Sequence, residues 1–402
     1  MKKYFKYTRK VIPSLLIVFG IVSIVLSSSS IADESRRDGA VYAMTNKADG
    51  NEVIVYDRAI DGTLNYSNTY PTGGLGTGGD EPFEPVDALG SQSPMILSQG
   101  NSFLFAVNAI SDTISVFRVN RLDNSLSLTD IVSSGGEFPV SLTMNDDLLY
   151  VLNSAGAASI SGFLFDDDTG QLKAINDSTR SLNFVGDDTL PRFLVAPAQI
   201  SFNEYGEVLV VTVKGSDSIH VFSMNKNGQP SANPVTTESN GSTPFGFGFD
   251  RNGHLLVAEA FGIGDVGQEE ASAVTSYQIN RSNTLTVISA SVANRQTASC
   301  WLISNNRIPF AYTTNNASHT ISGYKVEGNG GLSLLNASGI VASTGNNPVD
   351  LALTKHGQYL YAVNAGDGTI SMFRVNTSNG DLVSLGVVDG LPEKGAVGIA
   401  AR

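Results

Sequence analysis

The sequence predicts an all-β fold, a ring of seven four-stranded sheets around one axis, which is a seven-bladed β-propeller. One pattern of strand, loop and strand, clearest at Gln358–Val375, recurs seven times in the 402 residues, about once every 53 residues. A period of that size made of short strands is typical of one four-stranded blade per repeat. The 41 glycines suit many short strands joined by tight turns. We therefore expect a single propeller domain at residues 39–402.

Each repeat contains two apolar runs joined by a short polar loop, which is the pattern of a β-hairpin. The residue that ends the first run serves as the anchor of the repeat. The seven anchors are Asn46, Asn108, Asn153, Lys214, Glu259, Asn315 and Asn364. Asparagine side chains readily bond the backbone of their own loop, so we interpret the five asparagine anchors as structural.

A shorter apolar segment, often containing proline, precedes six of the seven hairpins. These segments begin at Ser93, Phe138, Ala196, Thr243, Thr297 and Asn347. Their small residues allow close approach at a narrow axis, which predicts the innermost strand of each blade. The weaker strand that follows each hairpin is expected at the outer rim.

The first hairpin, near Val41, has no such segment before it. Gly395–Ala401 has the small and apolar character of an inner strand and follows the last outer strand. We predict that this segment completes the first blade, because closure from both ends of the chain leaves no open sheet edge.

The N-terminal residues have a different composition. An apolar run, Val11–Leu26, follows five basic residues and ends in small residues up to Ala32. This order predicts a secretory signal peptide at residues 1–32. The alternative is an uncleaved membrane anchor, which needs about 20 apolar residues, more than this run provides. We expect a secreted or periplasmic protein.

The formal net charge of −13 disfavours nucleic acid and anionic membranes as partners, since both are negatively charged. We expect a monomer that binds no nucleic acid. The single cysteine, Cys300, excludes an intramolecular disulfide. Because it stands beside Trp301 in an apolar segment, it is predicted to be a buried small residue rather than a nucleophile.

The anchors and the starts of the inner strands should lie on one face of the ring. Lys214 and Glu259 place opposite charges there in consecutive blades. They can bind a polar ligand or form an ion pair that fixes the ring. The other candidates for substrate binding on this face are Gln199, Phe245, Gln296, His319 and Asp350.

No cluster of residues has the spacing of a metal site, and no cofactor is expected. Two acidic runs, Asp166–Asp168 and Asp265–Glu270, can bind calcium or be merely solvated. Three long loops interrupt the repeat and are either functional or tolerated insertions. They are Gly73–Gly90, Asn176–Pro197 and Phe261–Glu270.

The repeated YAVN, loop and TISVFRV pattern, with the turn Thr354–Leu360 and the inner strand Asn347–Leu353, resembles the seven-bladed propeller lactonases. That family includes 6-phosphogluconolactonase and the fungal carboxymuconate-cyclising enzyme. The resemblance covers residues 39–402 and implies that a small-molecule lactone is opened or formed in an axial pocket. Lys214 or Arg295 would then stabilise a carboxylate or oxyanion, and Glu259 would activate water or carry the proton.

Active members of that family carry a Pro-Arg-His motif at the start of an inner strand. The corresponding residues here are Thr243–Gly246, TPFG, so the arginine and the histidine are absent. The blades also resemble the YVTN-type propellers of surface proteins. The alternative function is therefore a non-catalytic propeller that binds a ligand or a protein through a degenerate lactonase site.

Overall fold

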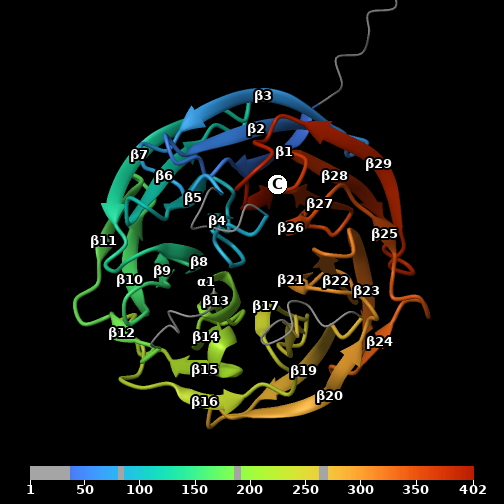
Figure 1. Ribbon diagram of the computed structural model, residues 1–402. Coiled ribbons are helices and arrows are strands. Elements are labelled where there is room, and N and C mark those ends of the chain that lie inside the picture. Colours follow the sequence, from blue (N-terminus) through green and yellow to red (C-terminus); the bar gives the residue numbers. More distant parts are fainter. Residues whose placement is uncertain (1–36, 80–85, 185–191, 262–269) are drawn as a thin grey trace, which may run out of the picture. The chain divides into compact units, whose positions relative to one another are not determined.

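The computed structural model describes residues 37–79, 86–184, 192–261 and 270–402. They belong to one compact unit, Arg37–Arg402, whose strands form seven antiparallel sheets arranged in a ring (Figure 1). The predicted fold class, an all-β seven-bladed propeller, is confirmed. The predicted signal peptide at residues 1–32 lies outside the described residues.

The blades are numbered in chain order, with the inner strand of each given first. Blade 1 contains β30 (Ile399–Ala401), β1 (Arg37–Met44), β2 (Glu52–Ala59) and β3 (Leu64–Pro71). Blade 2 contains β4 (Met95–Leu97), β5 (Phe103–Asn108), β6 (Thr113–Val119) and β7 (Leu126–Ser133). Blade 3 contains β8 (Pro139–Asn145), β9 (Leu148–Asn153), β10 (Ser159–Asp166), β11 (Gln171–Ala174) and β12 (Arg180–Ser181). Blade 4 contains β13 (Pro197–Phe202), β14 (Val208–Val213), β15 (Ser218–Ser223) and β16 (Val235–Glu238).

The remaining blades follow the same plan. Blade 5 contains β17 (Pro244–Phe249), β18 (Leu255–Glu259), β19 (Ala273–Ile279) and β20 (Leu285–Ala293). Blade 6 contains β21 (Ser299–Ser304), β22 (Phe310–Asn315), β23 (Thr320–Val326), β24 (Leu332–Leu334) and β25 (Ala342–Ser343). Blade 7 contains β26 (Pro348–Leu353), β27 (Tyr359–Asn364), β28 (Thr369–Val375) and β29 (Leu382–Asp389).

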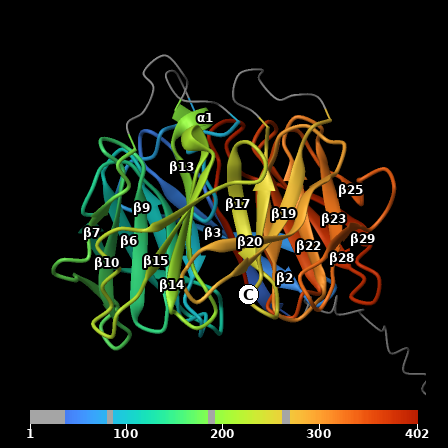
Figure 2. The ribbon, with the colours of Figure 1, turned by 90° about the horizontal axis from the view of Figure 1, so that it is seen from below.

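Two short helical segments interrupt the strands, one just before blade 4 and one between its second and third strands. They are the helix α1 (Arg192–Val195) and the 3₁₀ turn η1 (Lys214–Ser216). Figure 2 shows α1 on one face of the ring. Within the described part of the chain, no helix has both the length and the apolar character needed to cross a membrane.

The C-terminal strand closes the ring as the sequence predicts. β30 pairs antiparallel with β1, with Tyr42 opposite Ala400. The pairing is extended at both ends, where Met44 donates its N–H to the Gly398 carbonyl at 3.0 Å and Arg402 donates its N–H to the Ala40 carbonyl at 2.9 Å. Blade 1 is therefore held together by segments from opposite ends of the unit.

The second strand of each blade forms the core. Every residue of β5, β14 and β22 is buried, because neighbouring blades cover both faces of these strands. This explains why the second strands are continuous apolar runs rather than alternating ones. The outer strands, such as β7, are largely exposed.

Buried tyrosines on the second strands link successive blades. The hydroxyl of Tyr361 in blade 7 donates to the Gly62 carbonyl in blade 1 at 2.8 Å. The same bond recurs between Tyr150 and Gly228 and between Tyr312 and Gly380. Each of these tyrosines thus fastens its blade to an outer turn of the next blade.

Candidate functional site

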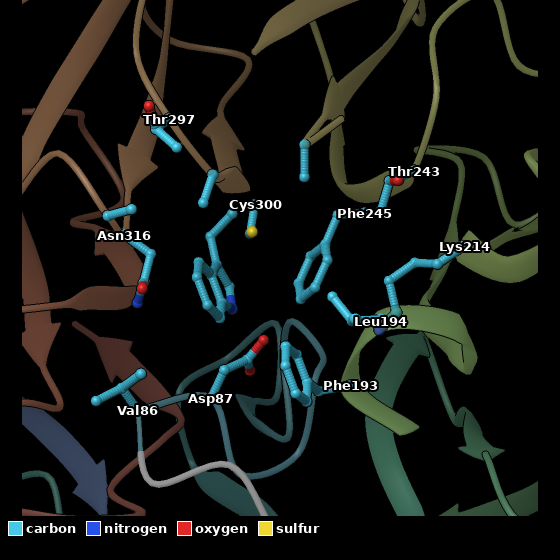
Figure 3. Close-up of a pocket in the computed structure, with 14 residues that line it drawn as sticks. Val86, Asp87, Phe193, Leu194, Lys214, Thr243, Phe245, Thr297, Cys300 and Asn316 are labelled. Atoms are coloured by element: carbon cyan, nitrogen blue, oxygen red, sulfur yellow. The ribbon is translucent and has the colours of Figure 1, made fainter. Parts of the chain in front are cut away.

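A cavity of about 220 Å³ lies where the inner ends of blades 4, 5 and 6 meet (Figure 3). Its walls come from α1, from the starts of β17 and β21, and from the segment that precedes β4. The lining residues are Val86, Asp87, Phe193, Leu194, Lys214, Thr243, Phe245, Ala260, Thr297, Ala298, Cys300, Trp301, Asn316 and Ala317. Most of these are apolar or aromatic, and the charged members of this described set are Asp87 and Lys214.

Gly90 holds both charged side chains. Its N–H donates to Oδ1 of Asp87 at 3.0 Å, and its carbonyl accepts a hydrogen bond from the Lys214 ammonium. The backbone at Gly90 has a φ of +60°, and a Cβ there would lie 2.8 Å from the Cα of Phe193. Only glycine fits this conformation and this close approach without strain. One backbone unit therefore positions a carboxylate and an ammonium in the same cavity wall.

Lys214 extends from η1, just after the end of β14, and is fully buried. Its Nζ lies 4.5 Å from the centroid of the Phe245 ring, where the face of the ring attracts a cation. Burial lowers the pKa of Lys214 to about 8, and the nearby Asp87 carboxylate opposes that decrease. The side chain is thus a cation at neutral pH that loses its proton at mildly alkaline pH.

A bulge at the start of β17 brings Phe245 into the cavity. Thr243, the residue before the strand, has a φ of 58°, and the register with β18 shifts between Pro244 and Phe247. A bulge of this kind changes the direction of the residues it contains. The corresponding bulge in β21 contains Cys300.

Cys300 and Trp301, from the start of β21, also line the cavity. Cys300 is buried, as the sequence predicts, and burial raises the pKa of its thiol. A thiol that resists ionisation is a poor nucleophile. The Trp301 indole N–H donates to the Ser91 carbonyl at 2.7 Å, and its ring centroid lies 5.0 Å from that of Phe245. The indole is therefore fixed at both ends.

Glu259 does not line the cavity, and the ion pair with Lys214, one of the two interpretations of these residues, does not form. The carboxylate of Glu259 accepts hydrogen bonds from the Gly241 N–H at 2.8 Å and from the Ser291 hydroxyl at 2.7 Å. Glu259 is still within β18, whereas Lys214 has left its strand in a 3₁₀ turn and points to Gly90. The pKa of Glu259 is raised, chiefly by burial.

Two of the predicted polar site residues complete the blades instead of lining the cavity. The amide of Gln199 donates to the Phe247 carbonyl at 3.1 Å and accepts the Phe247 N–H at 2.6 Å. Gln296 donates to the Arg295 carbonyl at 2.8 Å and accepts from the Thr320 hydroxyl at 3.2 Å. Arg295 itself is exposed on a loop.

His319 links two blades. Its Nδ1 accepts the N–H of Asn347, the residue before β26, at 2.9 Å. In two other blades an aspartate accepts the corresponding bond at 2.6 Å. Asp112 accepts the N–H of Phe138, and Asp217 accepts the N–H of Thr243. His319 therefore occupies a junction position of the repeat and does not line the cavity.

The model of the lactonase family of seven-bladed β-propellers matches residues 50–186, 185–293 and 268–398. The chain belongs to this family. The resemblance read from the repeat is thereby confirmed.

Solved structures share the fold of this lactonase-family propeller. A candidate 6-phosphogluconolactonase from Bacteroides fragilis is 19% identical with a TM-score of 0.67, and the match covers 92% of this chain and 99% of that one. The periplasmic gluconolactonase of Pseudomonas aeruginosa is 14% identical with a TM-score of 0.62, and the match covers 89% and 98% of the two chains.

Curated relatives match over a shorter stretch. An uncharacterised protein of Staphylococcus saprophyticus is 32% identical over 83 residues, which are 20% of this chain and 24% of that protein. An uncharacterised protein of Staphylococcus aureus is 35% identical over 86 residues, 21% and 25% of the two chains. The chain thus matches about a quarter of the length of these curated relatives.

In the lactonase-family propeller, three of the five asparagine anchors hold strands together, although they bond hydroxyl side chains and not the backbone of their own loop as expected. The Nδ2 of Asn315 donates to the hydroxyls of Thr320 and Ser322, both at 2.9 Å. Asn108 and Asn364 make the same pair of bonds in their own blades. These side chains fasten the second strand to the third.

Asp350 lies in the bulge at the start of β26 and is buried. Its Oδ2 has no hydrogen-bond partner among the described residues. Burial raises the pKa of Asp350 to about 8, an increase opposed by hydrogen bonds from the N–H groups of Ser93 and Leu351. At neutral pH this carboxyl group is mainly protonated.

The structure describes one of the two acidic runs in full and only the last residue of the other. Asp166, Asp167 and Asp168 are exposed, and one oxygen of each lies within 4.8 Å of the others. Exposed acidic side chains this close together can simply be solvated. The second run, Asp265–Glu270, falls almost entirely outside the described residues.

Proposed function

We propose that the protein hydrolyses a lactone in the cavity, with Asp87 as the general base and Lys214 as the group that stabilises the oxyanion. One observation carries the proposal: a carboxylate and an ammonium, both held by Gly90, meet in the wall of an otherwise apolar cavity. Catalytic acids and bases are characteristically found in such partly desolvated clefts.

The reaction follows from these two groups. Asp87 removes a proton from a water molecule as the water oxygen attacks the lactone carbonyl carbon. The carbonyl π bond opens, and the negative charge that develops on its oxygen is stabilised by the Lys214 ammonium. The ring C–O bond then breaks, the departing alkoxide takes the proton from Asp87, and a hydroxy acid is released.

The surroundings of Lys214 favour this role. The ring of Phe245 and the carbonyl of Gly90 stabilise the ammonium where burial would otherwise disfavour it. These two contacts also fix the position of the charge before substrate binds. Preorganised charge of this kind stabilises a transition state without the cost of reorganisation.

The test is a panel of lactones assayed with the purified chain and two matched carboxamide variants. Asp87→Asn should lower kcat by about 10²–10⁴-fold, because it removes the general base. Glu259→Gln should stay near the parent rate, since this side chain lies outside the cavity. Its amide oxygen can still accept the Gly241 N–H, and its NH2 group can donate to the Ser291 hydroxyl in place of the bond that Glu259 accepts from it. Equal activity of Asp87→Asn and the parent, or an equal loss in Glu259→Gln, would refute the assignment.

A second candidate function is ligand binding without chemistry in the same cavity. It is favoured by the loss of the family's arginine and histidine at the positions of Phe245 and Gly246. If no lactone is hydrolysed above background while a lactone still binds to the cavity, this function replaces the first.

We also propose that the protein is exported and that residues 1–32 are removed. The basic start, the short apolar run and the small residues up to Ala32 support this proposal. N-terminal sequencing of the mature protein tests it. A chain that keeps Met1 and stays with the membrane would indicate an anchor instead.

A further inference from the structure

We infer that the cavity selects small, uncharged lactones with an apolar or aromatic body, and that it rejects sugar lactones and their phosphates. This inference rests on the proposed function for its chemistry. It rests on the walls of the cavity for its selectivity. It therefore has separate tests for turnover and for binding.

The described lining residues provide few partners for a polyhydroxylated ring. Five of them are polar or charged, namely Asp87, Lys214, Thr243, Thr297 and Asn316, and the others are apolar, aromatic or, at Cys300, a thiol. Figure 3 shows the side chains of Phe193, Phe245 and Asp87 directed toward the middle of the cavity. Leu194 and Trp301 extend the apolar surface, and the Trp301 N–H is already bonded to Ser91. Several hydroxyl groups of a sugar lactone would be buried against these rings without partners, which disfavours their binding.

The charges in the cavity also disfavour a phosphate. The Lys214 ammonium is already bonded to the Gly90 carbonyl and interacts with the Asp87 carboxylate. A phosphate that approached Lys214 would also approach the negative charge of Asp87. Phosphate sites characteristically combine arginine with several N–H donors, and the described lining residues include no arginine.

Arg192 is the arginine closest in sequence to the lining residue Phe193, but its side chain is engaged elsewhere. Its guanidinium lies 4.6 Å from the centroid of the Phe138 ring and donates to the Ser154 hydroxyl at 3.3 Å. A phosphate could recruit Arg192 only at the expense of these contacts.

The size of the cavity agrees with a compact apolar substrate. An apolar cavity of about 150 Å³ is large enough to bind benzene. The cavity here, at about 220 Å³, has room for a benzene ring fused to a lactone ring. Dihydrocoumarin is such a molecule, and glucono-δ-lactone matches it closely in size while carrying hydroxyl groups instead of the aromatic ring.

The experiment compares kcat/KM for dihydrocoumarin, glucono-δ-lactone and 6-phosphogluconolactone with the full mature chain. We expect dihydrocoumarin to be preferred by about 100-fold or more, since an apolar site leaves each buried hydroxyl unpaired. Phe193→Ala should raise the KM for dihydrocoumarin at least about tenfold by removing one apolar wall. Phe249→Ala, a half-buried phenylalanine at the far end of β17, is the matched control and should leave that KM unchanged.

Binding measured by calorimetry separates this inference from the proposed function. If dihydrocoumarin binds but is not hydrolysed, and glucono-δ-lactone does not bind, the selectivity stands and the lactonase activity is refuted. If glucono-δ-lactone or its phosphate is the better substrate, the activity stands and the inference is overturned. If dihydrocoumarin neither binds nor reacts, or if Phe193→Ala behaves like Phe249→Ala, the inference is also overturned.

Discussion

Replacing Gly90 with alanine should disable the cavity while leaving the propeller folded. The backbone at Gly90 has a φ of +60°, and the new Cβ would lie 2.8 Å from the Cα of Phe193 and 3.2 Å from the Nζ of Lys214. A left-handed conformation costs an alanine about 1–2 kcal/mol. Relief of the overlap adds about 1–3 kcal/mol, because α1 or the Lys214 side chain must move. The free energy of unfolding should thus fall by about 2–5 kcal/mol, which a domain of ordinary stability tolerates.

Gly253→Ala is the matched control for this substitution. Gly253 also has a positive φ, of +81°, but a Cβ there would meet no atom within 4 Å. The free energy of unfolding of Gly253→Ala should fall only by the cost of the left-handed backbone conformation, about 1–2 kcal/mol. Denaturant unfolding measures both losses, and lactone hydrolysis should fall about 100-fold in Gly90→Ala alone, since a displacement near 1 Å is enough for such an effect. If the two variants lose the same stability and keep the same activity, Gly90 does not position the site.

Three further predictions concern pH and ring closure. Lactone hydrolysis should decline as the pH rises through about 8, because the buried Lys214 then loses the proton on which its charge depends; a rate that stays level up to about pH 10 would contradict this role. The pKa of Asp350 is raised to about 8, so the folded chain keeps a proton that the unfolded chain releases. The contribution of this proton to the free energy of unfolding is complete below the ordinary pKa of 3.8. It is lost as the pH rises to about 8, by up to about 1.4 kcal/mol per pH unit. Unfolding of Asp350→Asn should show a flatter dependence on pH, and an identical slope would exclude this group as the cause. Deleting Ile399–Arg402 should lower the melting temperature far more than a surface truncation, because it exposes the edge of β1, and unchanged melting would mean that β30 does not stabilise blade 1.

The repeat made the architecture predictable because it is written in local patterns. The run that ends at Asn364, the polar loop and the run that begins at Thr369 specify a hairpin from neighbouring residues alone. Because no inner-strand segment precedes the first hairpin, Gly395–Ala401 was predicted to supply that strand. In the structure the strand itself spans only Ile399–Ala401. Asparagine at an anchor position likewise bonds residues only five and seven positions away, as Asn315 does.

The site was less predictable because it depends on contacts between distant residues. Lys214 reaches Gly90, which is 124 positions away in sequence, and no local pattern marks that contact. Asp87 was one of several acids in the loop Gly73–Gly90, and the sequence does not show which of them faces the cavity. Lys214 and Phe245 line the cavity, whereas Glu259 was expected there because it shares the repeat position of Lys214. The 3₁₀ turn that carries Lys214 away from its strand breaks that equivalence.

The pairing of β30 with β1 also sets the order in which the blades can fold during synthesis of the chain. Six of the inner strands precede their own hairpins, so those blades can form as the chain is made. Blade 1 must wait, since β1 lacks its inner neighbour until Ile399–Ala401 has been synthesised. Throughout that interval a strand edge is available for pairing with other chains, which is a known route to aggregation. We therefore expect this protein to depend on molecular chaperones mainly before β30 has paired with β1.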